Sequence, residues 1–208
     1  ARMSPLATVD PGSGFADLEP LRAMIGSARV VGLGEATHGT REHFLLKHRL
    51  AEFLASEMGF TIFSIEASSP ESFAVDEFVS GQMPDEQAPD PAALVGGMYF
   101  WTWNTEEVLG LVRWMRSFNQ RERQANSGKH LRFTGFDMQT TTNCRRIVRD
   151  FVTAHDPEFL PALDAHWDTI RRGSVASTAV NFGAAISSID PAAARGKNTA
   201  SGAPSATP

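Results

Sequence analysis

The 208-residue sequence is short of several features that mark particular classes of protein. Cys144 is its only cysteine, which excludes an intrachain disulfide and a metal cluster held by several thiolates. No stretch is long and apolar enough to cross a bilayer, and the first residues, ARMSPLATVD, lack the apolar centre of a signal peptide. These absences lead us to expect a cytoplasmic protein with no membrane partner.

Positive charge and two familiar catalytic motifs are also scarce or missing. The net charge is −5, so nucleic acid is not expected as a partner. The sequence contains no G-x-S-x-G nucleophile elbow and no H-E-x-x-H zinc motif. With 42% hydrophobic residues the chain can still bury a core, and its catalytic residues have to be sought in other patterns.

The composition changes sharply near the end of the chain. From Pro191 onward the sequence reads PAAARGKNTASGAPSATP, without an aromatic residue and without Val, Ile, Leu or Met. Such a segment has little apolar surface to offset the entropy of ordering it. We therefore predict one α/β domain over residues 1–190 and a low-complexity, disordered tail over residues 191–208.

Three short apolar runs are typical of β-strands, because they are rich in β-branched and aromatic residues. RVVGLG ends at Glu35, FTIFSI ends at Glu66, and LRFTGF ends at Asp137. Helix-length segments separate the three runs. This alternation predicts an α/β fold with a mostly parallel sheet and helices on both of its faces.

The helical segments carry their own start and stop signals. One helix is expected to end at Gly59, and a Ser-Pro-Glu start predicts a helix over 69–81. Asn104 resembles the first residue of a capping box before a third apolar helical face. Helical spacing recurs over 147–152 and 160–170.

Acidic residues stand at the carboxyl ends of all the predicted strands. Ligands bind at this edge of an open parallel sheet, so we expect Glu35, Glu66 and Asp137 to lie near one another, with His38 beside them. A structural explanation stays open, since these residues could be helix caps and a hydrogen-bonded loop histidine. Structural charge networks also gather at such sheet edges.

The functional alternative is a hydrolytic site. His38 could take a proton from water and return it to a leaving group, while Glu35 or Glu66 fixes its tautomer. Lys47, nine residues after His38, could stabilise an oxyanion. The same acids and His38 could instead bind zinc or manganese, so a metal-assisted hydrolase also stays open.

Aromatic residues gather in the segment MYFWTWN. Trp101 and Trp103 could form a hydrophobic wall for a bulky substrate. They could instead attach the following helix to the sheet. Together with Lys47 and Asp137, they are the candidate substrate-binding residues.

Four blocks of the sequence resemble the erythromycin esterase family. They are GLGEATHGTREHFLLKHRL, FTIFSIEAS, WTWNTEEVLGLVRWMRSFN and LRFTGFDMQ, which occur in the family's order within residues 9–139. The resemblance implies an α/β fold and hydrolysis of an ester, the lactone of macrolide antibiotics in characterised members. It implies attack by water assisted by a histidine, with no obligatory metal and no other cofactor. His38, Glu35 and Glu66 match catalytic positions of the family, and Lys47 stands where some members have arginine.

The chain also departs from the family. Members are longer and carry a further histidine pair in a V-x-x-H-N-x-H-like block, which is absent here; His155 and His166 stand in other contexts. We therefore expect a chain truncated relative to the family, with weak or no macrolide esterase activity, or a remnant that binds an apolar ligand without turnover. A shortened sheet would expose an edge strand, through which we expect self-association.

Overall fold

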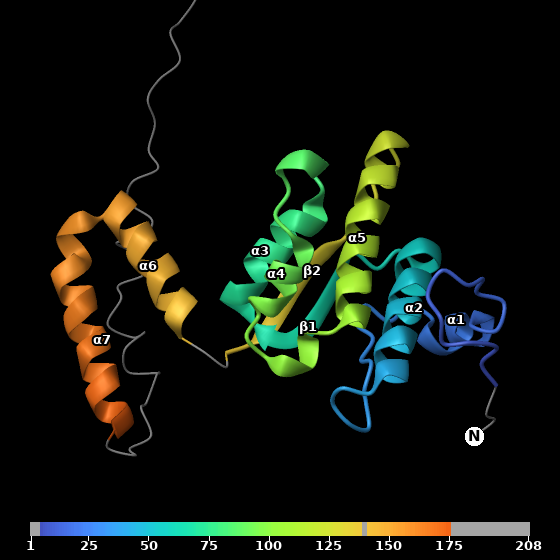
Figure 1. Ribbon diagram of the computed structural model, residues 1–208, viewed down its shortest axis with the longest axis horizontal. Helices are drawn as coiled ribbons and strands as arrows, with labels where there is room; N and C mark the ends of the chain where they lie inside the picture. The colour runs from blue at the N-terminus through green and yellow to red at the C-terminus, as the bar shows by residue number, and fades with distance from the viewer. Residues whose placement is uncertain (1–4, 139–140, 176–208) are drawn as a thin grey trace, which may run out of the picture. The chain divides into compact units, whose positions relative to one another are not determined.

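The structure is a computed structural model that describes residues 5–138 and 141–175 (Figure 1). The chain divides between Ile147 and Val148 into two compact units, which are described separately. The predicted domain boundary at residue 190 lies outside the described residues. Within them, no helix combines the length and the apolarity that crossing a membrane requires.

The first unit is built from a small parallel sheet and the helices around it (Figure 1). Helix α6 begins in this unit, and the second unit holds its remainder with η3 and α7. In chain order the elements are α1 (Glu19–Ile25), α2 (Arg41–Met58), β1 (Ile62–Ser68), α3 (Ser69–Ser80), η1 (Asp85–Gln87), α4 (Pro91–Gly96), η2 (Trp101–Trp103), α5 (Glu106–Gln124), β2 (Arg132–Asp137), α6 (Thr142–His155), η3 (Pro157–Phe159) and α7 (Leu160–Val175).

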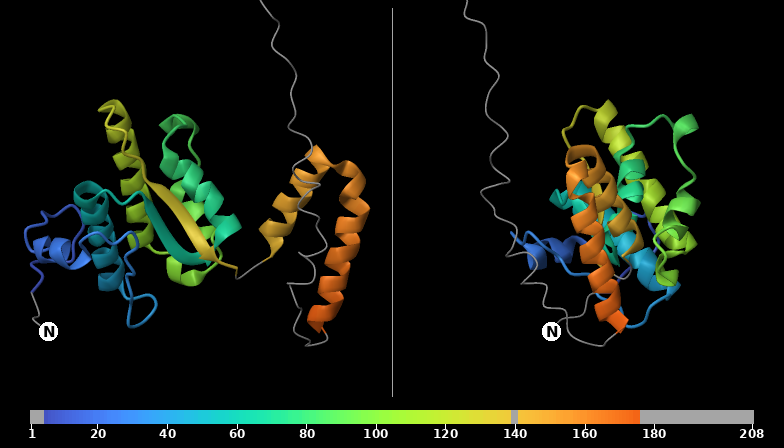
Figure 2. Two further views of the ribbon diagram at one scale, coloured as in Figure 1. Left: turned by 180° about the vertical axis from the view of Figure 1, so that it is seen from behind. Right: turned by 90° about the vertical axis from the view of Figure 1, so that its left-hand side faces the viewer.

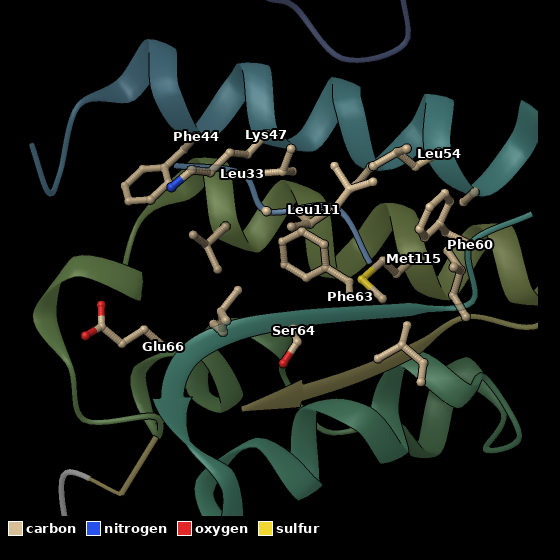
Figure 3. A pocket seen from close by; sticks show the side chains of 18 of the residues that line it. Leu33, Phe44, Lys47, Leu54, Phe60, Phe63, Ser64, Glu66, Leu111 and Met115 are labelled. Atoms are coloured by element: carbon tan, nitrogen blue, oxygen red, sulfur yellow. The ribbon is translucent and has the colours of Figure 1, made fainter. Parts of the chain in front are cut away.

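The two strands pair in parallel, with Ile62 opposite Arg132 and Ile65 opposite Gly135. Helix α3 lies on one side of the sheet, and α2 and α5 lie on the other (Figures 2 and 3). One apolar cluster joins α2, both strands, α3 and α5 into a single core. This arrangement confirms the predicted fold class, an α/β fold with a parallel sheet and helices on both faces.

Two helix ends lie where local signals predicted them. Helices α2 and α3 are closed by Gly59 and Gly81, whose φ angles of 76° and 63° are left-handed and favour glycine. Helix α3 has Pro70 in its first turn, where the missing N–H of proline costs no hydrogen bond. The helical patterns over 147–152 and 160–170 are likewise confirmed by α6 and α7.

The predicted strand over residues 29–34 is wrong. The residues run without regular secondary structure, and β1 and β2 form a sheet of two strands. A strand is defined by hydrogen bonds to a neighbour, and this segment has no backbone partner among the described residues. The composition of residues 29–34 therefore indicates a strand that could form only if another strand lay beside it.

The start of α5 also differs from the expected one by a residue. Thr105, not Asn104, is the N-cap, and its hydroxyl accepts a hydrogen bond from the Val108 N–H at 3.3 Å. Asparagine and threonine are both favoured at an N-cap, so neighbouring candidates compete, and the weaker one is used here because of where the helix begins.

A buried arginine attaches the N-terminal segment to α2. Arg49 is 1% exposed, and its guanidinium donates to both carboxylate oxygens of Asp17 and to the carbonyls of Thr8 and Gly14. The hydrogen bonds from Arg49 hold the pKa of the Asp17 carboxyl well below its usual range. Both terminal nitrogens of the guanidinium thus have acceptors, including a carboxylate that balances the buried charge, while the buried Nε has no hydrogen-bond partner among the described residues.

The two outer edges of the sheet differ in whether side chains cover their backbone groups. On β2 the outward N–H groups of Phe133 and Gly135 donate to Asp76 Oδ1 and Ser72 Oγ of α3, both at 2.8 Å. These side chains block that edge against further strands. Among the described residues no side chain covers the outer edge of β1 in this way, and that edge opens on a pocket. Self-association through an exposed edge stays a prediction.

Candidate active site

A short loop brings the first candidate residues to the start of α2. Glu35 follows the extended segment 29–34, and Gly39 turns the chain with a φ of 76° just before the N-cap Thr40. His38 therefore stands at the entrance of α2, while Lys47 projects from its second turn. Lys47 follows the N-cap Thr40 by about two helical turns, and residues two turns apart lie on the same face of a helix. Its side chain can therefore reach the loop that carries His38.

Glu35 is the centre of the site. Its Oε1 lies 2.5 Å from Nδ1 of His38, and its Oε2 accepts a hydrogen bond from Nζ of Lys47. The side chains of Glu35 and Lys47 are 12% and 16% exposed, whereas that of His38 is 44% exposed. The carboxylate and the ammonium are thus largely shielded, and the imidazole reaches solvent.

Two opposing effects act on the Glu35 carboxyl. Burial is the largest single effect, and it raises the pKa of Glu35. The hydrogen bonds from Lys47 and then from His38 together outweigh burial, so the pKa lies below its usual value. Glu35 is therefore ionised at neutral pH. An ionised carboxylate can only accept hydrogen bonds, so the neighbouring Nδ1 of His38 carries a proton. In the neutral ring, Nε2 then has a free lone pair.

Aromatic rings surround the imidazole. The ring centroids of Phe100 and Trp101 lie 5.8 Å and 6.5 Å from that of His38, both edge to face. Trp101 also packs on Gly39, where an added Cβ would come within 3.2 Å of Trp101 Cζ3. Trp103 is buried and donates from Nε1 to the carbonyl of Glu66 at 2.9 Å. The turn η2 thus contacts the His38 loop and the end of β1 together.

A pocket of about 770 Å³ begins at this site and continues between α2, α5 and β1 (Figure 3). Its charged side chains include Glu35, Lys47 and Glu66, and Figure 3 shows Lys47 and Glu66 toward one end of it. Apolar side chains line most of the remainder, including Leu54, Phe60, Phe63, Leu111 and Met115 (Figure 3). The pocket therefore joins a group of charged residues to an apolar interior.

The structure brings some of the predicted residues together and leaves others apart. Glu35, His38, Lys47, Glu66 and Trp103 all line the pocket. Two further candidates do not line it: Trp101 sits over Gly39, and Asp137 ends β2, where its carboxylate accepts from the Met138 N–H.

Sequence reasoning missed one ion pair at the pocket. Arg41, the first residue of α2, donates from Nε to Oε1 of Glu107 at 3.0 Å, and Glu107 lines the pocket with 15% of its side chain exposed. The sequence showed Glu107 only as part of a helix start. The partners are 66 positions apart in the chain, so no local signal of their contact exists.

The described His, Cys, Asp and Glu side chains do not suggest a metal centre. Among the residues that the structure describes, no set of three or more His, Cys, Asp and Glu side chains could hold an ion together. His48 is 6% exposed and burial lowers its pKa to about 4, so it stays neutral in the core beside Trp114. At Glu35 the ammonium of Lys47 occupies the oxygen that a cation would need.

The chain is similar to known proteins over most of its length. A sequence model described as erythromycin esterase matches residues 55–200, which include Glu66, Trp101, Trp103 and Asp137. The erythromycin esterase type II of Escherichia coli is 28% identical over 172 residues, which are 81% of this chain and 38% of that protein. The chain thus spans well under half of the length of this relative.

Solved structures share the fold. A succinoglycan biosynthesis protein is 30% identical with a TM-score of 0.65, covering 80% of this chain and 40% of that one. An open-conformation histidine-to-asparagine mutant of the erythromycin esterase EreC superposes with a TM-score of 0.54, at 23% identity, over 76% of this chain and 36% of EreC. Because the sequence model covers most of the chain, the protein belongs to the erythromycin esterase family.

Proposed function

We propose that the chain hydrolyses an ester by attack of water, with His38 as general base. The observation that carries this proposal is the double contact of Glu35, which holds His38 on one carboxylate oxygen and Lys47 on the other. Family membership supports the class of reaction. Since the matched relatives are much longer, the activity of this chain by itself is part of the proposal.

The protons can be followed through the reaction. Nε2 of His38 takes a proton from water as the water oxygen bonds to the ester carbon, and the carbonyl oxygen becomes an oxyanion. Glu35 stabilises the imidazolium through Nδ1. The tetrahedral intermediate then collapses, the bond between carbon and the alcohol oxygen breaks, and the imidazolium returns its proton to the leaving oxygen. The products are a carboxylic acid and an alcohol.

Lys47 acts through Glu35 in this scheme. Its ammonium is already hydrogen-bonded to the carboxylate, so it keeps Glu35 ionised and in place for His38. This assignment differs from the oxyanion role that the sequence suggested for Lys47. Glu66, whose carboxylate stands at the same pocket, is proposed to orient the water or the alcohol of the substrate.

The proposed substrate is an ester with a large apolar body, and a macrolide lactone is the first candidate. The name of the Escherichia coli relative supports this choice. Trp101 supports it as well, because its ring is 65% exposed next to His38 and offers a flat apolar surface at the reacting group.

The proposal is tested with p-nitrophenyl acetate and with erythromycin, each with and without EDTA. We expect turnover of the aryl ester that EDTA leaves unchanged, and weak or absent ring opening of erythromycin measured by mass spectrometry. Turnover that EDTA removes and zinc restores would assign the reaction to a metal-assisted hydrolase. No turnover of either ester would favour a chain that binds an apolar ligand without reacting.

Gly39→Ala is expected to lower kcat for the aryl ester about tenfold, with little change in KM, because a small displacement of a catalytic group is costly. The new Cβ would meet Trp101 and would also strain a left-handed backbone, so the loop that carries His38 must move. Gly34→Ala is the matched control, since no atom lies within 4 Å of its added Cβ. Equal kinetics for both variants would show that Trp101 and Gly39 do not position His38.

A further inference from the structure

Arg41 stands next to the loop that carries His38, at a helix position that does not favour a positive charge. It is the first residue of α2 and follows His38 by three positions. Because the N-terminus of a helix carries partial positive charge, a cation in the first turn is locally unfavourable. The Arg41 side chain is 67% exposed, so packing in the core does not explain the choice of residue either. A residue that goes against a local preference without a gain in packing is a candidate for a functional role.

Glu107 fixes the Arg41 guanidinium beside the pocket. Nε of Arg41 donates to Oε1 of Glu107 at 3.0 Å, and Glu107 lines the same pocket as His38 and Glu35. The Glu107 side chain is 15% exposed and belongs to the first turn of α5, so it is the better fixed partner of the pair. An exposed ion pair adds little to stability, but this one limits the freedom of a long side chain. A side chain that is already ordered loses less entropy when it binds a ligand.

The guanidinium keeps donors that the protein does not use. Among the residues that the structure describes, Arg41 makes its hydrogen bond through Nε, and neither Nη1 nor Nη2 makes one. These two nitrogens form a flat edge whose N–H groups match the two oxygens of a carboxylate. Lys47, the cation held on Glu35, is largely shielded and has its carboxylate already. Arg41 can therefore receive an anion near His38 without releasing Glu107.

We propose that Nη1 and Nη2 of Arg41 bind a carboxylate that the substrate carries in addition to its ester. This inference rests on the proposed function and narrows its substrate class to acidic esters. A carboxylate fits better than a doubly charged phosphate group, because Glu35, Glu66 and Glu107 line the pocket and repel a second negative charge. Erythromycin has no carboxylate, so its lactone should react more slowly than an acidic ester with an apolar body of similar size.

Binding without turnover is measured with adipic acid mono-p-nitroanilide, which has an amide in place of the ester, and with its methyl ester, in which the carboxylate is capped. The nitroanilide absorbs where tryptophan emits, so bound probe quenches the fluorescence of the full chain. We expect the acid to bind at least about tenfold more tightly than the methyl ester, because hydrogen bonds between charged groups are the stronger kind. Equal affinities for the two probes, or no binding of the acid at millimolar concentration, would overturn the proposal. This comparison uses the parent chain alone and needs no variant to fold.

Substitutions assign the preference to Arg41. In Arg41→Gln the ratio of the two affinities should fall to about one, because the amide carries no charge. Arg41→Lys keeps the charge without the flat pair of nitrogens, and should retain only part of the preference. Arg113→Gln is the matched control and should keep the parent's ratio, since Arg113 is exposed on α5, does not line the pocket, and changes the net charge equally when lost. The parent's ratio in Arg41→Gln or in Arg41→Lys, or an equal loss in Arg113→Gln, would contradict the assignment.

Hydrolysis of matched esters separates this inference from the proposed function. The substrates are mono-p-nitrophenyl adipate and its methyl ester, and the release of p-nitrophenolate is followed. We expect kcat/KM to be about tenfold higher for the acid, with the difference mainly in KM, because the carboxylate is bound equally before and during the reaction. Hydrolysis of both esters at equal kcat/KM would refute the carboxylate site and leave the proposed function standing. Preferred binding of the acidic anilide without hydrolysis of either ester would do the reverse.

Discussion

His38→Ala should reduce ester hydrolysis by about a hundredfold to ten-thousandfold, the usual contribution of a general acid–base group. Lys47 cannot replace the imidazole as the base, because its ammonium is held on Glu35. The measurement is kcat/KM for p-nitrophenyl acetate, with circular dichroism to show that the fold is kept.

We expect His38→Ala to lose activity without losing stability. The side chain of His38 is 44% exposed and is held by Glu35 in a surface loop, so its removal leaves no cavity in the core. His155→Ala is the matched control, since that histidine is exposed on α6 and its Nδ1 donates to the carbonyl of Phe151 in the same helix at 2.9 Å. Turnover of His38→Ala within a few-fold of the parent would refute its role, and a large fall in melting temperature would point to a structural one.

Gly135→Ala should lower the free energy of unfolding by about 3 kcal/mol, at the upper end of the usual cost of overpacking. A methyl group at this position would overlap the carbonyl oxygen of Ala67 and crowd that of Ser68. Both are backbone atoms of β1, which cannot rotate aside as a side chain would. The strands would have to separate at the end that carries Glu66.

Urea unfolding followed by tryptophan fluorescence measures the effect. Gly110→Ala in α5 is the control, because among the described residues no atom beyond its own helical turns and chain neighbours lies within 4 Å of its added Cβ. Alanine in a helix interior is better than glycine by about 0.5–1 kcal/mol, so this variant should be slightly more stable than the parent. Equal stability of Gly135→Ala and the parent would mean that the strands pair less closely than in the structure.

The parts of the fold that were predictable from the sequence are those with local causes. The ends of α2 and α3 follow from Gly59 and Gly81, which adopt a backbone conformation that other residues avoid. The pairing of Glu35 with His38 was also within reach, since they are only three positions apart in the chain. In each case the interacting groups are near neighbours in the chain, so the residue types alone carry the information.

The tertiary structure alone decided the rest. Residues 29–34 have strand composition, yet they form no strand because hydrogen bonds to a neighbour define one. Trp101 and Trp103 look alike in the sequence, but one stands on Gly39 and the other is buried on the carbonyl of Glu66. Contacts between distant segments depend on how helices and strands pack, and the energies of many such packings are too similar for local pattern to choose among them.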